Sequence, residues 1–167
     1  LCGLFPCQQL VCLIGRNGSG KSTFLRTLAG LQPPLSGDAR WQECDSAVSC
    51  RSLSKEELAR VFSVGLTEQP DEVNLSVHDV VAMGRMPYTG FFGNLGQDDE
   101  AMVERALRLT GMSAFASRGI STLSDGERQK VMIARAIAQH TPVMLLDEPT
   151  AFLDYESKKT TMAMLHA

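Results

Sequence analysis

A glycine-rich segment near the start of the chain has the residue types and spacing of a phosphate-binding loop. It reads Gly15, Arg16, Asn17, Gly18, Ser19, Gly20, Lys21, Ser22, Thr23. Glycines let backbone N–H groups turn toward an anion, and a helix that follows adds partial positive charge at its N-terminus. Lys21 can then reach outer phosphates, and the Ser22 hydroxyl can ligate Mg²⁺. The pattern therefore predicts a site for the phosphates of a nucleotide.

The flanking sequence supplies the elements that such a loop needs. Residues 10–14 are a continuous apolar run, which predicts a strand, and residues 22–31 read as a helix closed by Gly30. A strand, a loop and a helix in this order are the context that the motif requires. The alternative, a flexible glycine turn, is disfavoured by that context.

Two adjacent acids follow a second apolar run. The run at 143–146 is typical of a buried strand, and Asp147 and Glu148 come directly after it. Open α/β sheets bind ligands at the carboxyl ends of their strands. Asp147 can hold Mg²⁺ through its water shell, and Glu148 can orient or deprotonate an attacking water. A strand that ends in a solvated turn is the alternative, which the phosphate loop disfavours.

A second candidate phosphate site lies at the start of another predicted helix. Its residues are Leu123, Ser124, Asp125, Gly126 and Glu127. A serine followed by glycine and glutamate also begins many ordinary helices, so the segment alone indicates no more than an N-cap. The predicted helix, from 125 to about 140, is apolar on most faces and therefore largely buried. It leads directly into the apolar run that ends in the two acids.

In this order, the segments resemble the nucleotide-binding subunits of ABC transporters. Residues 15–23 correspond to the Walker A loop, 123–127 to the signature, 143–148 to Walker B and 150–154 to the D-loop. The resemblance covers essentially all 167 residues and implies an α/β fold, a P-loop NTPase core with a helical subdomain and a small antiparallel β region. It implies ATP and Mg²⁺ as cofactors, with Glu148 as the catalytic residue of ATP hydrolysis. ATP binding is carried over to Gly15, Asn17, Gly18, Ser19, Gly20, Lys21, Ser22 and Thr23, and Mg²⁺ binding to Ser22 and Asp147.

The resemblance also accounts for the second phosphate-type sequence. In ABC proteins two nucleotide-binding domains meet head to tail, and the signature of one caps the ATP of the other. Ser124, Gly126, Glu127 and Asp154 are therefore expected to act in trans, in a homodimer. Asp125 stands where the usual signature has a glycine, and its carboxylate either points away from the nucleotide or caps its own helix.

A further segment narrows the type of transporter. The stretch 80–88, followed by a helix with an acidic start at 98–100, resembles the helical subdomain of importers for iron-siderophore, haem or cobalamin. Without the resemblance, Gly84 to Tyr88 reads as a helix end and a turn. The implied partners are transmembrane permease subunits and, indirectly, a periplasmic or surface binding protein. The expected location is peripheral, on the cytoplasmic face of the plasma (inner) membrane.

The family's Q-loop, which couples the nucleotide to the membrane partner, is expected within residues 64–69. Gln69 has the expected chemical type, and Glu68 fits the spacing about equally well. Either residue could also approach Mg²⁺. The assignment between the two stays open.

Composition excludes several other classes of protein. A hydrophobic content of 44% and a net charge of -3 are typical of a globular domain, without the basic excess expected of a nucleic-acid binder. No apolar run approaches the ~18 residues of a membrane span, so a partner must provide any membrane contact. The five cysteines form no close-spaced pair and no histidine accompanies them, which favours free thiols over a metal site.

The predicted organisation is a single, partial ABC-type nucleotide-binding domain over 1–167. Its core covers 1–35 and 121–167, the antiparallel β region covers about 36–50, and the helical subdomain covers about 71–123. A capping box at Ser54 predicts a short helix, a second helix starts near Ser76, and a third places Met102, Ala106 and Leu109 on one face.

The ends of the domain are expected to be incomplete. Phe5 lies too close to Lys21 to serve as the aromatic that stacks on adenine, and His166 falls where the helix after the D-loop belongs. The chain therefore reads as a fragment truncated at both ends. A soluble, non-transport ABC ATPase and a catalytically incompetent fragment are the alternatives to an importer subunit.

Overall fold

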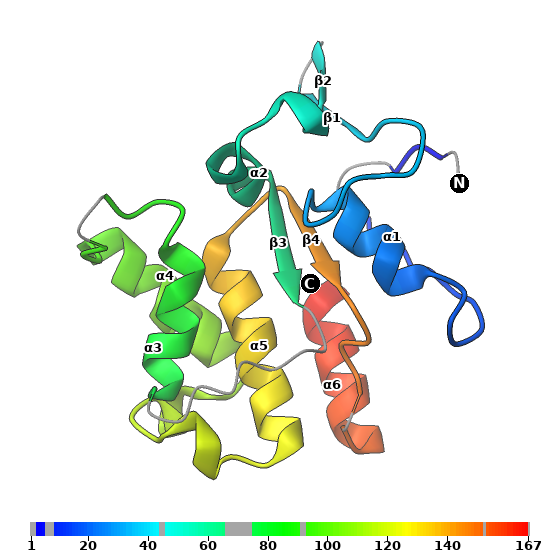
Figure 1. The fold of residues 1–167 in the computed structure, drawn as a ribbon. Helices are drawn as coiled ribbons and strands as arrows, with labels where there is room; N and C mark the ends of the chain where they lie inside the picture. Colours follow the sequence, from blue (N-terminus) through cyan, green and yellow to red (C-terminus); the bar gives the residue numbers. More distant parts are fainter. Residues whose placement is uncertain are drawn as a thin grey trace.

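The computed structural model describes residues 3–5, 9–43, 46–65, 75–90, 93–151 and 153–166. Figure 1 shows how the helices and strands of these residues are arranged. The longer elements are α1 (Lys21–Leu28), β1 (Arg40–Glu43), β2 (Ser46–Ser49), α2 (Lys55–Val61), β3 (Phe62–Gly65), α3 (Val77–Ala82), α4 (Gln97–Leu109), α5 (Asp125–Gln139), β4 (Val143–Leu146) and α6 (Tyr155–His166).

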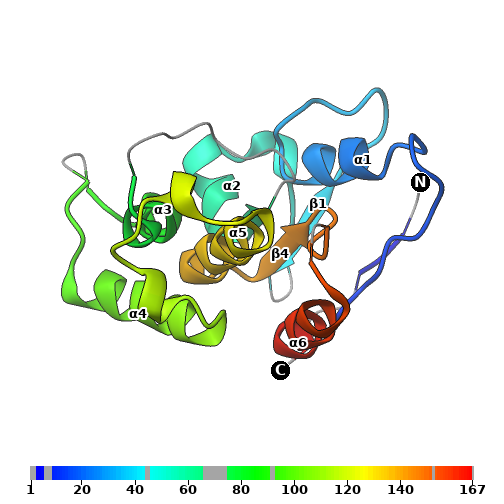
Figure 2. The same ribbon diagram turned by 90° about the horizontal axis from the view of Figure 1, so that it is seen from below.

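A parallel pair of strands lies at the centre of the fold. β3 and β4 are in register from Phe62 opposite Val143 to Gly65 opposite Leu146. The amide of Asp147 donates to the Gly65 carbonyl at 2.9 Å and extends the pairing by one residue. α5 lies beside β3, while α1 and α6 lie on opposite sides of β4 (Figures 1 and 2). The carboxyl ends of both strands therefore share one edge, as the α/β prediction requires.

The antiparallel region is confirmed as a small separate sheet. β1 and β2 pair from Arg40 opposite Ser49 to Glu43 opposite Ser46. Asp38 lies beside this pair, where it accepts hydrogen bonds from the Ser49 hydroxyl at 2.8 Å and from Arg40 Nε at 3.1 Å.

Helices α3, α4 and α5 bury a common apolar core. Capping boxes at Ser54, Ser76 and Ser124 begin α2, α3 and α5. The boxes confirm the predicted helix starts at Ser54 and Ser76. The core residues are Val77, Val80, Val81, Val103, Ala106, Leu107, Met112, Ile120, Leu123, Val131, Met132, Ala134 and Ala138.

The buried face of α4 is not centred on the stripe of Met102, Ala106 and Leu109. Leu109 is 49% exposed, whereas Val103 and Leu107 are buried together with Ala106. Apolar residues at helical spacing can form two neighbouring stripes that share Ala106. Contacts of α4 with both α3 and α5 select the stripe that contains Val103 and Leu107.

The predicted strand at 10–14 is wrong. The backbone of residues 9–16 is irregular in the structure, and Ile14 is 90% exposed. Neither of the two described sheets includes this segment. An apolar run favours burial, but a strand also needs a neighbour that accepts and donates its backbone hydrogen bonds. The phosphate loop therefore follows an irregular, exposed segment and not a sheet strand.

Candidate functional site

The backbone of the phosphate loop requires glycine at two positions. Gly18 and Gly20 have φ values of 75° and 90°, in the left-handed region that strains other residues. At Gly15, an added Cβ would lie 2.9 Å from the Ser19 hydroxyl oxygen. The loop is closed by a hydrogen bond from the Ser19 amide to the Arg16 carbonyl at 3.2 Å. Its tight backbone course thus depends on the glycines that the motif contains.

Lys21 is the first residue of α1, and its side chain folds back over the loop. Its Nζ donates to the carbonyls of Gly15 at 2.9 Å and Arg16 at 3.0 Å. Ser22 is the next helical residue and is partly exposed. The ammonium group and the N-terminus of α1 concentrate positive charge at this loop, which is the electrostatic requirement for binding phosphate.

The two acids after β4 have different environments. Asp147 is 7% exposed at the edge where β3 and β4 end. Glu148 is exposed and has a φ of 49°, which is uncommon for a residue other than glycine. A turn follows, in which the Ala151 amide donates to the Glu148 carbonyl at 2.9 Å. One carboxylate is therefore suited to holding a cation at the strand end, and the other faces solvent.

Ser124 is the N-cap of α5. Its backbone amide and its hydroxyl both donate to Glu127 Oε2 at 2.8 Å, and the Glu127 amide donates to the Ser124 hydroxyl at 3.3 Å. The bond from the Ser124 amide, followed by that from its hydroxyl, lowers the pKa of Glu127 below its ordinary value. The side chains of Ser124 and Glu127 are thus hydrogen-bonded within their own chain.

Asp125 is paired with a cation one turn along the helix. Its Oδ1 lies 3.6 Å from Arg128 Nη1, and the side chain is 65% exposed. Arg128 Nη2 also donates to the Ser121 carbonyl at 3.2 Å. The sequence left open whether Asp125 caps its own helix. In the structure Ser124 is the cap, and the Asp125 carboxylate lies beside the Arg128 guanidinium.

Asp154 begins α6. Its two carboxylate oxygens accept from the Ser157 amide at 2.8 Å and from the Ser157 hydroxyl at 3.1 Å. The bond from the Ser157 amide is the main reason that the pKa of Asp154 lies below its ordinary value. Leu153, directly before it, is buried and fixes the start of this turn.

Two further predictions concern the Q-loop residue and the aromatic side chain that would stack on adenine. Glu68 and Gln69 lie outside the described residues. Phe5 is half-exposed and packs against Phe24 of α1, with ring centroids 6.3 Å apart and an interplanar angle of 54°.

Among the described residues, no three His, Cys, Asp or Glu side chains lie close enough together to hold a metal ion. None of the helices of these residues is long and apolar enough to cross a membrane.

Sequence reasoning missed the part played by Arg85. The residue is buried, and its Nε donates to Asp99 Oδ1 at 2.9 Å. Its neighbour Gly84 packs so closely on α5 that an added Cβ would overlap the Arg135 carbonyl. The only available signal was a charged residue between a glycine and a Pro-Tyr turn, which does not indicate its distant partners.

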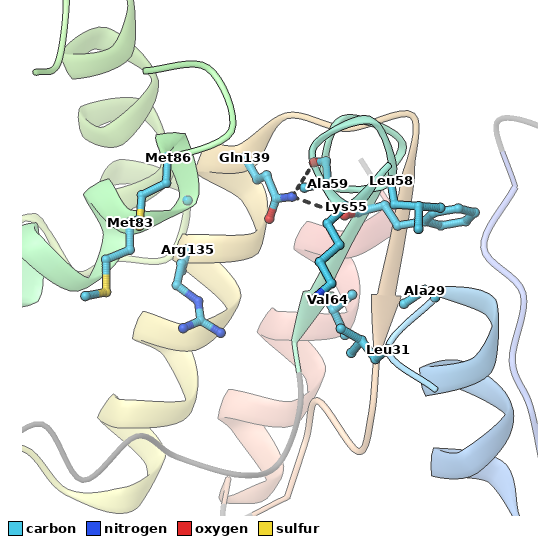
Figure 3. A pocket seen from close by; sticks show the side chains of 13 residues that line it. Ala29, Leu31, Lys55, Leu58, Ala59, Val64, Met83, Met86, Arg135 and Gln139 are labelled. Atoms are coloured by element: carbon cyan, nitrogen blue, oxygen red, sulfur yellow. Dashed lines mark hydrogen bonds between the residues drawn. The ribbon is translucent and has the colours of Figure 1, made fainter. Parts of the chain in front are cut away.

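A groove of about 500 Å³ lies where α2, α5 and the segment after α3 meet (Figure 3). Gln139 spans from α5 to its neighbours: its Nε2 donates to the Ala59 carbonyl at 2.6 Å and to the Phe62 carbonyl at 3.1 Å. The apolar lining includes Leu31, Leu58, Met83 and Met86, and the polar lining includes Lys55, Arg135 and Gln139.

Comparison with known proteins identifies relatives across nearly the whole chain. The family described as ABC transporter matches residues 4–151. The cobalamin import ATP-binding protein BtuD of Halobacterium salinarum is 40% identical over 157 residues, which are 94% of this chain and 38% of that protein. The iron(3+)-hydroxamate import ATP-binding protein FhuC of Bacillus subtilis is 35% identical over 161 residues, 96% of this chain and 58% of that protein. The chain thus spans about half the length of the curated relatives it matches.

Solved structures with the same fold belong to the same group. A putative metal-chelate type ABC transporter in an inward-facing conformation matches with a TM-score of 0.78 and 28% identity, over 97% of this chain and 58% of that one. The ATP-binding cassette MJ0796, a dimer bound to ADP and Pi, matches with a TM-score of 0.71 and 26% identity, over 90% and 65% of the two chains. The predicted P-loop NTPase fold is therefore confirmed.

Proposed function

The chain belongs to the ABC transporter family, and we propose that it binds and hydrolyses ATP to drive an importer of a metal chelate, namely iron-siderophore, haem or cobalamin. The observation that carries the proposal is the combination of a glycine-dependent phosphate loop at the start of α1 with Asp147 and Glu148 at the end of a parallel strand. Each half alone fits several functions. Together they supply the groups that phosphoryl transfer requires.

ATP binding is assigned to the loop at 15–23. Backbone N–H groups of the loop and of the first turn of α1 would donate to phosphate oxygens. Lys21 would exchange its two loop carbonyls for the outer phosphates, because an ionic hydrogen bond to phosphate is stronger than one to a neutral carbonyl.

The donor set fits Mg²⁺. Ser22 offers a hydroxyl and Asp147 a carboxylate, and Mg²⁺ prefers a few such oxygen ligands while it keeps several waters. When bound, the ion offsets charge on the phosphate oxygens.

Glu148 is the proposed general base. Its exposed carboxylate would orient a water molecule and take its proton as the water oxygen attacks the terminal phosphorus. The bond from that phosphorus to the ADP oxygen then breaks, and ADP and phosphate are released. The left-handed backbone at Glu148 is compatible with a functional role, since strained residues gather at active sites.

The signature is proposed to act on the nucleotide of a second domain. Ser124 and the N-terminus of α5, with Gly126 and Glu127 in the same turn and Asp154 before α6, would meet the ATP bound by the partner. Ser124 Oγ would then turn from Glu127 to the partner's phosphate. The Asp125–Arg128 pair supports this role because it offsets the carboxylate charge near the incoming anion.

The groove in Figure 3 is the proposed contact with a transmembrane permease. Its methionines suit an apolar helix end, since Met86 is 65% exposed and methionine adapts to irregular surfaces. Such a contact would hold the domain peripherally on the cytoplasmic face of the membrane. The substrate class rests on relatives that import cobalamin and iron hydroxamate.

An uptake experiment tests the proposal. Cells that lack the gene would be supplied with radiolabelled iron hydroxamate, haem or cobalamin, and rescue by the wild-type and Glu148→Gln forms would be compared. We expect one substrate to depend on the wild-type gene and not to be restored by Glu148→Gln. Unchanged uptake of all three would contradict the assigned substrate class, and full rescue by Glu148→Gln would contradict the assigned chemistry.

A further inference from the structure

Arg85 caps the C-terminal end of α5. Its Nη1 donates to the carbonyls of Ala138 at 2.9 Å and Gln139 at 3.3 Å. The last carbonyls of a helix have no partners within the helix, and they lie at the negative end of its dipole. A guanidinium at this position therefore satisfies both the hydrogen bonds and the charge of the helix end.

The same guanidinium reaches two further groups. Its Nε donates to Asp99 in the first turn of α4, and its Cζ lies 4.1 Å from the centroid of the Tyr88 ring. Asp99 is itself fixed, because its other oxygen accepts from the Gly96 amide at 3.0 Å. The Arg85 side chain is 11% exposed and joins the start of α4 to the end of α5.

The neighbouring residues leave α5 little room to shift. Gly84 lies directly against the Arg135 backbone, where even a methyl group would overlap. On the other side, Gln139 ties α5 to the backbone of Ala59 and Phe62. Met83, Gly84 and Met86 also line the groove, so the Arg85 contacts lie directly behind its wall.

The opposite end of α5 carries Ser124. The helix has 15 residues, which at 1.5 Å per residue is about 22 Å. Its middle is packed against α3 and α4 through Val131, Met132 and Ala134. A helix packed along its length would transmit a shift of its C-terminal end to its N-terminus, which gives Arg85 a route to Ser124.

We propose that Arg85 is a positioning residue: by fixing the end of α5 behind the groove, it holds Ser124 where the partner domain's ATP can be met. The inference rests on the proposed function. It assigns to Arg85 no contact with the nucleotide. In this proposal α5 connects the groove, which Gln139 lines at its C-terminal end, to the signature at its N-terminal end.

The test uses the full-length protein with Glu148→Gln, which is expected to form a dimer with ATP. Adding Arg85→Gln should weaken ATP-driven dimerisation by about tenfold, within the usual range for coupled sites. ATP affinity of the monomer should stay unchanged. Arg85→Lys keeps a cation on the α5 carbonyls and should recover part of the loss. Dimerisation would be followed by analytical ultracentrifugation and monomer binding by calorimetry.

Val103→Ala is the matched control, because it weakens the α4 core without removing the Arg85 contacts. It should lower the melting temperature but leave dimerisation unchanged. Equal loss of dimerisation in the control, or none in Arg85→Gln, would overturn the inference alone. Failure of the Glu148→Gln parent to dimerise would overturn the proposed function and this inference with it. If Arg85→Gln does not fold, Asp99→Asn is subjected to the same comparison.

Discussion

The Ser124 hydroxyl and the Glu127 carboxylate are hydrogen-bonded to each other at 2.8 Å within one capping box. A second hydrogen bond joins the Ser124 amide to the same carboxylate oxygen. The residue proposed to meet the partner's phosphate is therefore also the residue that begins α5. Its two roles can be separated by experiment, because the chain contains another capping box of the same kind at Ser54 and Glu57.

We expect Ser124→Ala to weaken both the helix and the dimer. Loss of a serine cap costs about 1 kcal/mol, and Ser54→Ala should cost a similar amount. Only Ser124→Ala should reduce ATP-driven dimerisation, because only that box faces the proposed partner. Melting curves and ultracentrifugation with ATP measure the two effects. Equal dimerisation by the two variants would remove Ser124 from the interface.

Acid should destabilise the fold partly through this box. The pKa of Glu127 is lowered in the folded state, chiefly by the Ser124 amide. Near its ordinary pKa of 4.5, the unfolded chain thus binds more protons than the folded one, and stability falls as the pH drops through this value and then through the lower folded pKa. Glu127→Gln removes the titrating carboxylate while the Ser124 amide keeps an acceptor, so this variant should flatten the pH dependence of the melting temperature below about pH 5. An unchanged pH dependence of the melting temperature in this variant would show that Glu127 does not contribute to the loss of stability in acid.

These examples separate what sequence can predict from what it cannot. The N-cap at Ser124 and the strand before Asp147 depend on residues within a few positions of one another, and the structure has both, although no residue of β4 is buried as its apolar run predicts. The strand at 10–14 failed because pairing depends on a neighbour that an apolar run does not specify. Arg85 was missed for the same reason: Ala138 is 53 residues away along the chain. The pairing of Asp125 with Arg128 is local, but the two orientations that the sequence left open did not name Arg128 as a partner.

Lys21→Ala should abolish detectable ATP binding. The side chain supplies the ammonium at the loop, and its two loop hydrogen bonds hold it there. Lys55→Ala is the control, since Lys55 lines the groove on α2 and not the loop. Calorimetry with ATP should show full affinity for the control. Undiminished affinity in Lys21→Ala would overturn the assignment of the loop.

Glu148→Gln should bind ATP, fail to turn it over and accumulate as a dimer. The amide is close in shape to the carboxylate but cannot take a proton from water. Glu156→Gln changes an exposed acid on α6 and should leave turnover unchanged. Phosphate release and light scattering measure the two properties. Normal turnover by Glu148→Gln would remove this residue as the general base.

Gly84→Ala should destabilise the domain although it adds only one methyl group. The new Cβ would overlap the Arg135 carbonyl of α5, and backbone cannot move aside as a flexible side chain can. Overpacking of this kind costs typically about 1–3 kcal/mol. Gly90→Ala is the matched control, because nothing lies within 4 Å of its added Cβ. Urea denaturation should give a lower midpoint for Gly84→Ala only. Equal midpoints would show that α5 can shift away from the segment after α3, and would weaken the case that Arg85 holds it in place.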